Sequence, residues 1–251
     1  MNDSFSTVAN LLGVSEDALS PAVLNLAAPL DLRYERIEGD ERDAVIRDEI
    51  LLETPSRTGP HGWESYWREV KDRWERSGRD DAWLVPSFLR TVNGPVRLFG
   101  DYVQPATPSF LWHCQRIILT HLAEKYLSKN RAVLEFGAGS GFNLIELQRL
   151  LPLSHLYGLD RSEAAVETIA ASNFAANRFD MEYPQSLSPR VCEGAAVLTM
   201  GALEQVGDRF RSFLAWILAA RPVVCVHVEP LVELYDEKQL LDALAVRYHR
   251  A

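Results

Sequence analysis

The sequence has few cysteines and no long apolar run. Its three cysteines, Cys114, Cys192 and Cys225, lie far apart. They lack the paired spacing of a zinc site or a disulfide framework, so we expect buried, reduced thiols. No run of about 18 apolar residues occurs, which argues against a membrane-spanning helix, and Asp3 precedes any basic residue in a start that does not look like an export signal. These absences predict a cytoplasmic protein with no membrane partner.

Basic residues are also in deficit. The 26 lysines and arginines stand against 35 aspartates and glutamates, for a formal net charge of −9. A broad phosphate-binding surface is therefore disfavoured, and no nucleic-acid partner is expected. No cluster of histidine and carboxylate residues has metal-ligand spacing, so no metal is predicted. A length of 251 residues, 47% of them hydrophobic, suits one main core with a smaller lobe.

Residues 1–128 predict a mainly helical N-terminal lobe with a β-hairpin, acting as a substrate or lid region. Capping residues and apolar spacing predict helices over 4–13, 15–26 (interrupted at Pro21), 40–53 and 109–126. Asn93 and Gly94 separate two runs rich in β-branched and aromatic residues, which predicts a hairpin from Phe88 to Phe99.

Aromatic residues gather at helical spacing just before that hairpin. Trp63, Tyr66, Trp67 and Trp74 share one broad face of a predicted helix. This stripe predicts packing against the second lobe; the alternative is a lid over a substrate or cofactor.

From residue 129 to residue 251, short β-rich runs alternate with helical stretches. Such alternation is typical of a doubly wound α/β fold, in which a mostly parallel sheet has helices on both faces. The last stretch, Glu237 to His249, predicts a helix after the fifth strand and leaves no residues for further strands. The exposed edge of the fifth strand would then be covered by the predicted hairpin, by a second copy or by a partner subunit.

A glycine-rich turn follows the first predicted strand of this domain. Glu135 precedes Gly137, Gly139 and Gly141 in the segment EFGAGSGFN, and Asp160 ends the second strand 160 − 141 = 19 residues later. Glycines there let a ligand approach the backbone, and an acid at the second strand tip suits ribose hydroxyls.

Two cofactors compete for this geometry. A nicotinamide dinucleotide site needs a third glycine where this chain has Phe142. Glu135, two residues before the first glycine, suits a cationic ligand without phosphate.

The segment resembles the glycine motif E/D-x-G-x-G-x-G of class I S-adenosylmethionine-dependent methyltransferases, over about residues 132–230. The resemblance implies a Rossmann-like methyltransferase fold, short at its C-terminus, and S-adenosyl-L-methionine as cofactor. It implies that Gly137, Ala138, Gly139 and Gly141, with Glu135, border the methionine part. Asp160 would hold the ribose.

The resemblance also extends to the later strand ends. Arg161 and Asp180 would contact the adenine, and the backbone around Met200 and Gly201 would line the cofactor. The family often has histidine where this chain has Gln205, which weakens a histidine base at that position.

Catalytic candidates follow the fourth and fifth strands, because ligands collect beyond the carboxyl ends of an open sheet. His227 and Glu229 point the same way on a strand, and Glu204 follows the fourth strand. His227 also has a structural interpretation as a core histidine, and Glu204 has one as a helix N-terminal charge. The expected reaction is methyl transfer to a small molecule, as O-methylation of a sugar or natural-product hydroxyl. The alternatives are a non-catalytic subunit of the same fold and, less favoured, an NAD-dependent oxidoreductase.

Overall fold

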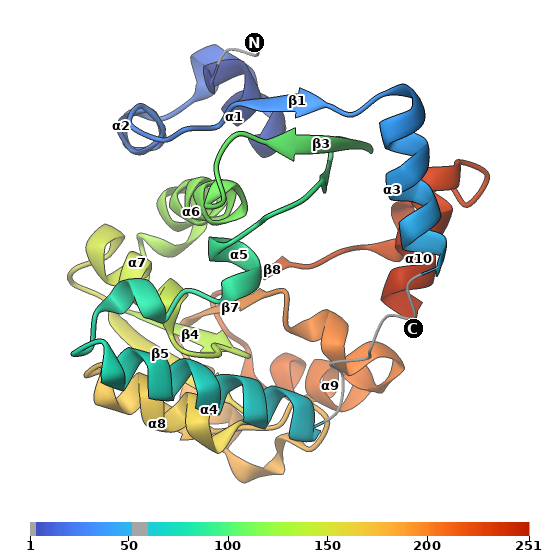
Figure 1. Cartoon of the computed structure of the whole chain (residues 1–251). Coiled ribbons are helices and arrows are strands. Elements are labelled where there is room, and N and C mark those ends of the chain that lie inside the picture. The colour runs from blue at the N-terminus through green and yellow to red at the C-terminus, as the bar shows by residue number, and fades with distance from the viewer. Residues whose placement is uncertain (1–3, 52–59, 251) are drawn as a thin grey trace. The chain divides into compact units, whose positions relative to one another are not determined.

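The structure is a computed structural model that describes residues 4–51 and 60–250 (Figure 1). The chain forms two compact units, each assembled from separate stretches. The first unit comprises Met1–Ser56, Ser87–Ile118 and Leu231–Ala251, and the second comprises Arg57–Pro86 and Leu119–Pro230. The compact units therefore do not follow a boundary between residues 128 and 129.

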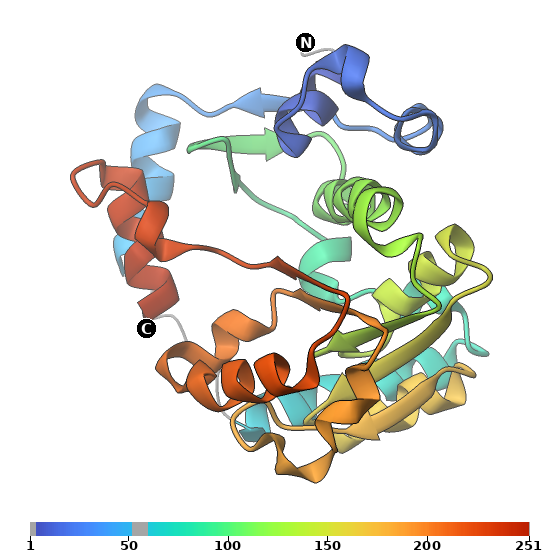
Figure 2. The ribbon, with the colours of Figure 1, turned by 180° about the vertical axis from the view of Figure 1, so that it is seen from behind.

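The second unit contains a five-stranded parallel sheet (Figure 2). The order is β6-β5-β4-β7-β8, so the strand order reverses at β4, as in a doubly wound sheet. This confirms the predicted fold class. The strands are β4 (Ala132–Phe136), β5 (His155–Asp160), β6 (Ala175–Arg178), β7 (Ala196–Met200) and β8 (Val224–Val228).

Alternate residues of the strands bury opposite faces of this sheet, because side chains on a strand alternate in direction. Val133 belongs to the core under α7 (Phe142–Leu150) and the end of α6 (Phe110–Leu122), whereas Leu134 belongs to the core under α9 (Arg211–Ala220). The face of Val133 also receives Ile169 of α8 (Glu163–Ala171).

Helix α4 (Pro60–Arg76) carries the aromatic stripe and packs on α8. Trp67 and Val70 contact the fully buried Ala164 and Ala165, whose small side chains let the helices approach. The predicted packing of the stripe against the sheet domain is confirmed.

The first unit has a three-stranded antiparallel sheet of order β1-β3-β2, formed by β1 (Tyr34–Arg36), β2 (Val96–Leu98) and β3 (Asp101–Pro105). One core packs around Val8 and Phe110, and a second packs around Tyr102 and Leu241. Its helices are α1 (Ser4–Leu12), α2 (Pro21–Ala27), α3 (Gly39–Leu51), α5 (Ser87–Arg90), most of α6, and α10 (Leu240–Arg250).

Shorter helical turns connect these elements. The 3₁₀ turns are Glu16–Ala18, Asp81–Trp83, Pro184–Ser186, Pro189–Cys192, Leu203–Phe210 and Val232–Leu234, and a π-turn covers Ala123–Leu127. Within the described residues, no helix combines the length and apolar character needed to cross a membrane. Of the cysteines, Cys114 and Cys192 are buried and Cys225 is half-buried, all as free thiols.

The predicted hairpin from Phe88 to Phe99 is wrong. Phe88 lies in α5, and the real hairpin pairs β2 with β3 around the turn Phe99-Gly100. Both turn residues have positive φ, 52° and 79°, as a tight two-residue hairpin turn requires. Pro95 directly follows Asn93-Gly94 and has no N–H to donate to a strand ladder, so it disfavours a hairpin turn at Asn93-Gly94.

The hairpin also adds no strand to the parallel sheet. Strand β3 pairs with β1 and β2, and within the described residues no strand of this hairpin pairs with β8. Coverage of the β8 edge by the hairpin, a second copy or a partner subunit stays a prediction.

We expect Gly100→Ala to lower the free energy of unfolding by about 1 kcal/mol, because a Cβ is strained at positive φ even where nothing crowds it. Gly94→Ala is the matched control, since Gly94 also has open space around it but no positive φ. Urea unfolding measures both variants. Equal losses would place the tight turn at Gly94 instead.

Candidate functional site

The glycine loop connects β4 to α7 and is held against the neighbouring strand. The amides of Gly137 and Ala138 both donate to the Leu159 carbonyl of β5, at 2.7 and 3.1 Å. All three glycines have positive φ, between 56° and 80°. The loop therefore needs glycine for its backbone shape before any ligand is considered.

Asp160 lies at the end of β5 and ties two loops together. Its Oδ2 accepts the Gly139 amide at 2.8 Å and its Oδ1 accepts the Ser162 amide at 2.8 Å. Only 6% of the residue is exposed. Burial raises the pKa of Asp160, while these backbone hydrogen bonds oppose the rise. Each carboxylate oxygen has lone-pair capacity for one further donor.

A small pocket opens at the carboxyl ends of the strands, where ligands bind in doubly wound sheets. Its volume is about 80 Å³. It brings together residues that follow four different strands, with two tryptophans from α4. The lining residues are Trp63, Trp67, Gly137, Asp160, Arg161, Phe179, Asp180, Met181, Gly201, Ala202, Gln205 and Val206.

The two tryptophans form the wall that α4 contributes. A Cβ on Gly139 would lie 2.5 Å from the Trp67 ring, so this indole covers the glycine loop. Trp63 stacks on Trp67 with ring centres 5.8 Å apart. The Trp63 indole N–H is buried and has no hydrogen-bond partner among the residues that the structure describes. A buried donor without a partner is costly, and an acceptor on a ligand in this pocket would satisfy it.

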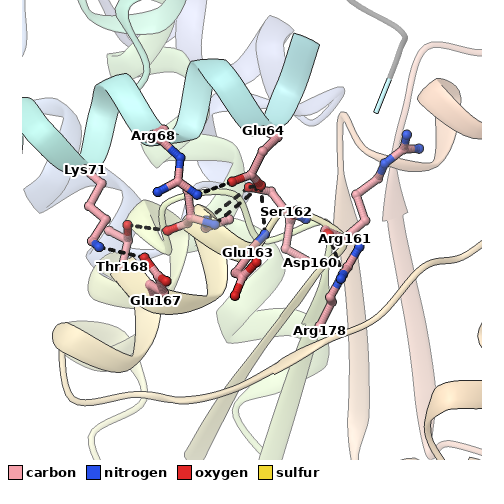
Figure 3. A network of polar contacts seen from close by, with 12 residues as sticks. Glu64, Arg68, Lys71, Asp160, Arg161, Ser162, Glu163, Glu167, Thr168 and Arg178 are labelled. Atoms are coloured by element: carbon pink, nitrogen blue, oxygen red, sulfur yellow. Dashed lines mark hydrogen bonds and ion pairs between the residues drawn. The ribbon is translucent and has the colours of Figure 1, made fainter. Parts of the chain in front are cut away.

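Glu64, one turn before Arg68 on α4, closes the start of α8 (Figure 3). Its Oε2 accepts from the Ser162 hydroxyl at 2.7 Å and the Glu163 amide at 2.8 Å, and its Oε1 from Arg68 at 2.5 Å. Burial alone would raise the pKa of Glu64, but the hydrogen bonds from Ser162, Arg68 and the amides outweigh it and lower the pKa. A second link, 2.6 Å between Lys71 Nζ and Glu167 Oε2, joins the same two helices.

Glu135 is buried beneath the loop and does not line the pocket. It is 1% exposed, its Oε1 accepts from Asn143 Nδ2 at 2.7 Å, and its Oε2 has no hydrogen-bond partner. Burial raises the pKa of Glu135 to about 8. Its carboxyl group therefore holds a proton at neutral pH.

The three catalytic candidates all lie after β7 or on and after β8, and none lines the pocket. His227 Nδ1 is 2.8 Å from the Thr199 hydroxyl of β7. Glu229 accepts the amides of Leu203 and Glu204 at 3.1 and 3.2 Å, so it caps the 3₁₀ turn there. Glu204 Oε1 accepts from Gln205 Nε2 at 3.0 Å, and burial raises the pKa of Glu204.

Of the proposed cofactor residues, the structure brings Gly137, Asp160, Arg161, Asp180 and Gly201 to the pocket. The proposed residues outside its lining are Glu135, Ala138, Gly139, Gly141 and Met200. Gly139 lies under Trp67, and a Cβ built on Gly141 would point at Ile169 of α8.

Sequence reasoning missed Glu64, Phe179 and Met181. Phe179 and Met181 flank Asp180, so the loop after the third strand carried the signal for them. No signal in the sequence pointed to Glu64, because its partner Ser162 is 98 residues away along the chain.

Comparisons with known proteins found distant likenesses only. No family model and no curated protein matches the chain. The plantazolicin methyltransferase BpumL in complex with SAH is 14% identical, with a TM-score of 0.39, over 82% of this chain and 73% of that chain. Human N-acetylserotonin methyltransferase in complex with SAM is 10% identical, with a TM-score of 0.35, over 85% and 48%.

An O-methyltransferase family protein from Burkholderia thailandensis is 16% identical, with a TM-score of 0.30, over 91% of this chain and 67% of that chain.

We expect Glu64→Gln to lower the free energy of unfolding by about 1 kcal/mol at pH 7, because a neutral amide is a weaker cap at a helix N-terminus. Since the pKa of Glu64 is lowered, its contribution is present above its ordinary value of 4.5 and is lost as the pH falls through the lowered value. Unfolding curves of the variant and the wild type should therefore converge in acid. Glu69→Gln is the control, because Glu69 lies on the same helix in an exposed pair with Arg73, and we expect little change at either pH.

Glu135→Gln should flatten the pH dependence of stability. The folded protein keeps a proton on Glu135 up to about pH 8, whereas the unfolded chain releases it near 4.5. The contribution of Glu135 is thus full below pH 4.5 and is lost as the pH rises through about 8. Glutamine imitates the protonated acid and removes that decline. Denaturant unfolding at pH 5 and pH 8 measures it; parallel pH profiles for variant and wild type would show that Glu135 titrates normally.

Proposed function

We propose that this protein is an S-adenosylmethionine-dependent methyltransferase acting on a small molecule in the cytoplasm. The observation that carries the proposal is the pocket at the carboxyl ends of the sheet. A buried carboxylate, Asp160, lies there beside the glycine loop, and the same pocket is lined by Trp63, whose indole N–H has no hydrogen-bond partner among the described residues. A nucleoside offers hydroxyl donors to the first group and ring or hydroxyl acceptors to the second.

The charges around the pocket favour a cofactor without phosphate. The side chain of Glu64, from α4, caps the N-terminus of α8, the helix that begins just after Asp160. Its carboxylate would repel a phosphate on the ribose. Phe142, the first residue of α7, packs with the Trp67 cluster, where a dinucleotide would place its pyrophosphate. Both features disfavour the oxidoreductase alternative.

The polar groups that line the pocket fit S-adenosylmethionine, but the pocket is too small to hold it unless Trp63 and Trp67 move. About 80 Å³ is less than the roughly 300 Å³ at which small-molecule sites begin. Trp63 and Trp67 are held by packing, since the polar links of α4 come from Glu64 and Lys71. Turning these two rings would lengthen the pocket along the glycine loop while the helix stays anchored.

Each part of the pocket has a proposed role. Asp160 would hold the ribose, and Arg161 with Asp180 and Met181 would border the adenine. Gly137, Ala138, Gly139 and Gly141 would border the methionine part, with Glu135 beneath it, and the backbone at Met200 and Gly201 would close the other side.

Bound S-adenosylmethionine supplies a methyl group on a sulfonium for in-line displacement. This chain's part is to align an acceptor and, for a hydroxyl, to take its proton. His227 is the first proposed base, because partial burial lowers its pKa and leaves the imidazole neutral at pH 7. Glu204 and Glu229 are the other proposed residues, and the cap that Glu229 forms makes it also a positioning residue for Glu204.

A hydroxyl of a sugar or natural product is the proposed acceptor, since an acidic protein suits neutral or cationic small molecules. The second candidate is a non-catalytic subunit that binds cofactor or a partner chain. Gln205, which lines the pocket where the family often has histidine, favours it.

Titration calorimetry tests the cofactor. We expect S-adenosylhomocysteine to bind the wild type and NAD to give no heat. Asp160→Asn should weaken binding at least about tenfold, since it loses a charge-assisted hydrogen bond to ligand hydroxyls. Asp81→Asn, in an exposed 3₁₀ turn of the same unit, is the control and should bind as the wild type does.

Binding without turnover would support the non-catalytic candidate. A labelled methyl donor, incubated with a small-molecule extract and read by mass spectrometry, separates the two. NAD binding in place of S-adenosylhomocysteine would overturn the proposal.

A further inference from the structure

A larger cavity lies in the first unit, away from the glycine loop in sequence and formed by none of its residues. Its volume is about 390 Å³, within the range of small-molecule sites. Three segments build it: the end of α3, the β2–β3 hairpin turn, and the chain from Tyr235 through α10.

One wall of this cavity carries a partly buried arginine. Arg97 has 26% of its side chain exposed, and its Nη2 lies 3.3 Å from Asp242 Oδ1. Its Nε is buried and has no hydrogen-bond partner in the described part of the chain. A guanidinium offers five donors in a rigid fork, and a bound carboxylate would use the ones that Asp242 leaves unfilled.

An opposite charge also lines the cavity. Glu49 belongs to the wall, and Asp242 is already engaged by Arg97 and by the Asp236 amide at 3.0 Å. Burial raises the pKa of the Tyr102 phenol. The charge of Glu49 raises this pKa further, and the charge of Arg97 lowers it. Both charges therefore act on one buried hydroxyl, and both line this cavity.

The remaining wall is aromatic. The Tyr235 ring lies under the Arg97 guanidinium at 5.7 Å and stacks on His249 at 6.4 Å. Phe99 and Tyr248 keep 50% and 57% of their surface exposed, although both face the cavity. An apolar or aromatic group in the cavity would cover these rings.

We propose that this cavity is a binding site for a free amino acid with an aromatic side chain. Its carboxylate pairs with Arg97, its ammonium with Glu49, and its ring lies among Phe99, Tyr235 and Tyr248. A monoanion would supply no partner for Glu49, and a monocation would leave unused the Arg97 donors that Asp242 does not take. A zwitterion is therefore the class that uses both groups.

Ligand-detected NMR on the full chain, without methyl donor, tests this on the wild type alone. The probes are L-phenylalanine, 3-phenylpropionate and phenethylamine, which share the ring and differ in charge. We expect L-phenylalanine to bind at least about tenfold more tightly than either analogue, because 3-phenylpropionate lacks the ammonium for Glu49 and phenethylamine lacks the carboxylate for the remaining Arg97 donors. Equal binding of all three, or no binding of L-phenylalanine, would overturn the proposal.

Two variants assign the charges. Arg97→Gln should weaken L-phenylalanine binding at least about tenfold. Glu49→Gln should weaken L-phenylalanine but strengthen 3-phenylpropionate, a reversal that a merely structural role would not produce. Arg36→Gln is the control, since Arg36 is exposed in the same unit and outside the cavity. The assignment would be wrong if Arg36→Gln lost as much binding as Arg97→Gln. It would also be wrong if Glu49→Gln left the order of the three ligands unchanged, a result that does not depend on whether Arg97→Gln folds.

Discussion

The second unit depends on one buried carboxylate. Asp160 accepts the amide of Gly139 on one oxygen and that of Ser162 on the other, so it fixes the glycine loop after β4 to the first turn of α8. A carboxylate buried to this extent is costly unless hydrogen-bonded, and here two backbone donors offset the cost. Those donors belong to two different β–α junctions, the one after β4 and the one after β5. Asp160 therefore fixes the position of these two junctions relative to each other.

Acidic side chains converge around that edge. Glu64, Glu135 and Asp160 come from three elements, and each is stabilised by a different means: helix amides and Arg68 for the first, a proton for the second, loop amides for the third. The result is an edge that suits hydroxyl groups and positive charge and disfavours phosphate. This selectivity depends on how each acid is held, since Glu64 pairs with Arg68, Glu135 keeps its proton and Asp160 accepts only backbone amides among its described contacts.

Much of the fold was predictable from the sequence, because hydrophobic period and capping residues are local signals. All five strands of the parallel sheet and the helices between them were found in this way, as was the packing of the α4 aromatic stripe. The hairpin failed for a local reason too: Asn93-Gly94 carried the stronger turn signal, but Pro95 follows it and the real turn uses Phe99 in a left-handed conformation that phenylalanine seldom adopts.

The site was less predictable, because it depends on distant partners. The register of Asp160 with the glycines could be counted along the chain, whereas the Glu64 cap and the Trp67 cover join residues of α4 to segments 70 or more residues away. Burial of Glu135 also changes its protonation, which its type alone does not reveal.

The chain passes between its two compact units at four points, after residues 56, 86, 118 and 230. The core around Tyr102 therefore stays incomplete until Leu241 and Leu244 have left the ribosome, whereas the parallel sheet is complete once β8 has been made. During synthesis from the N-terminus, the core around Val8 and Phe110 can form once Ile117 has been made and the parallel sheet once β8 has been made, so the core around Tyr102 is the last to be completed.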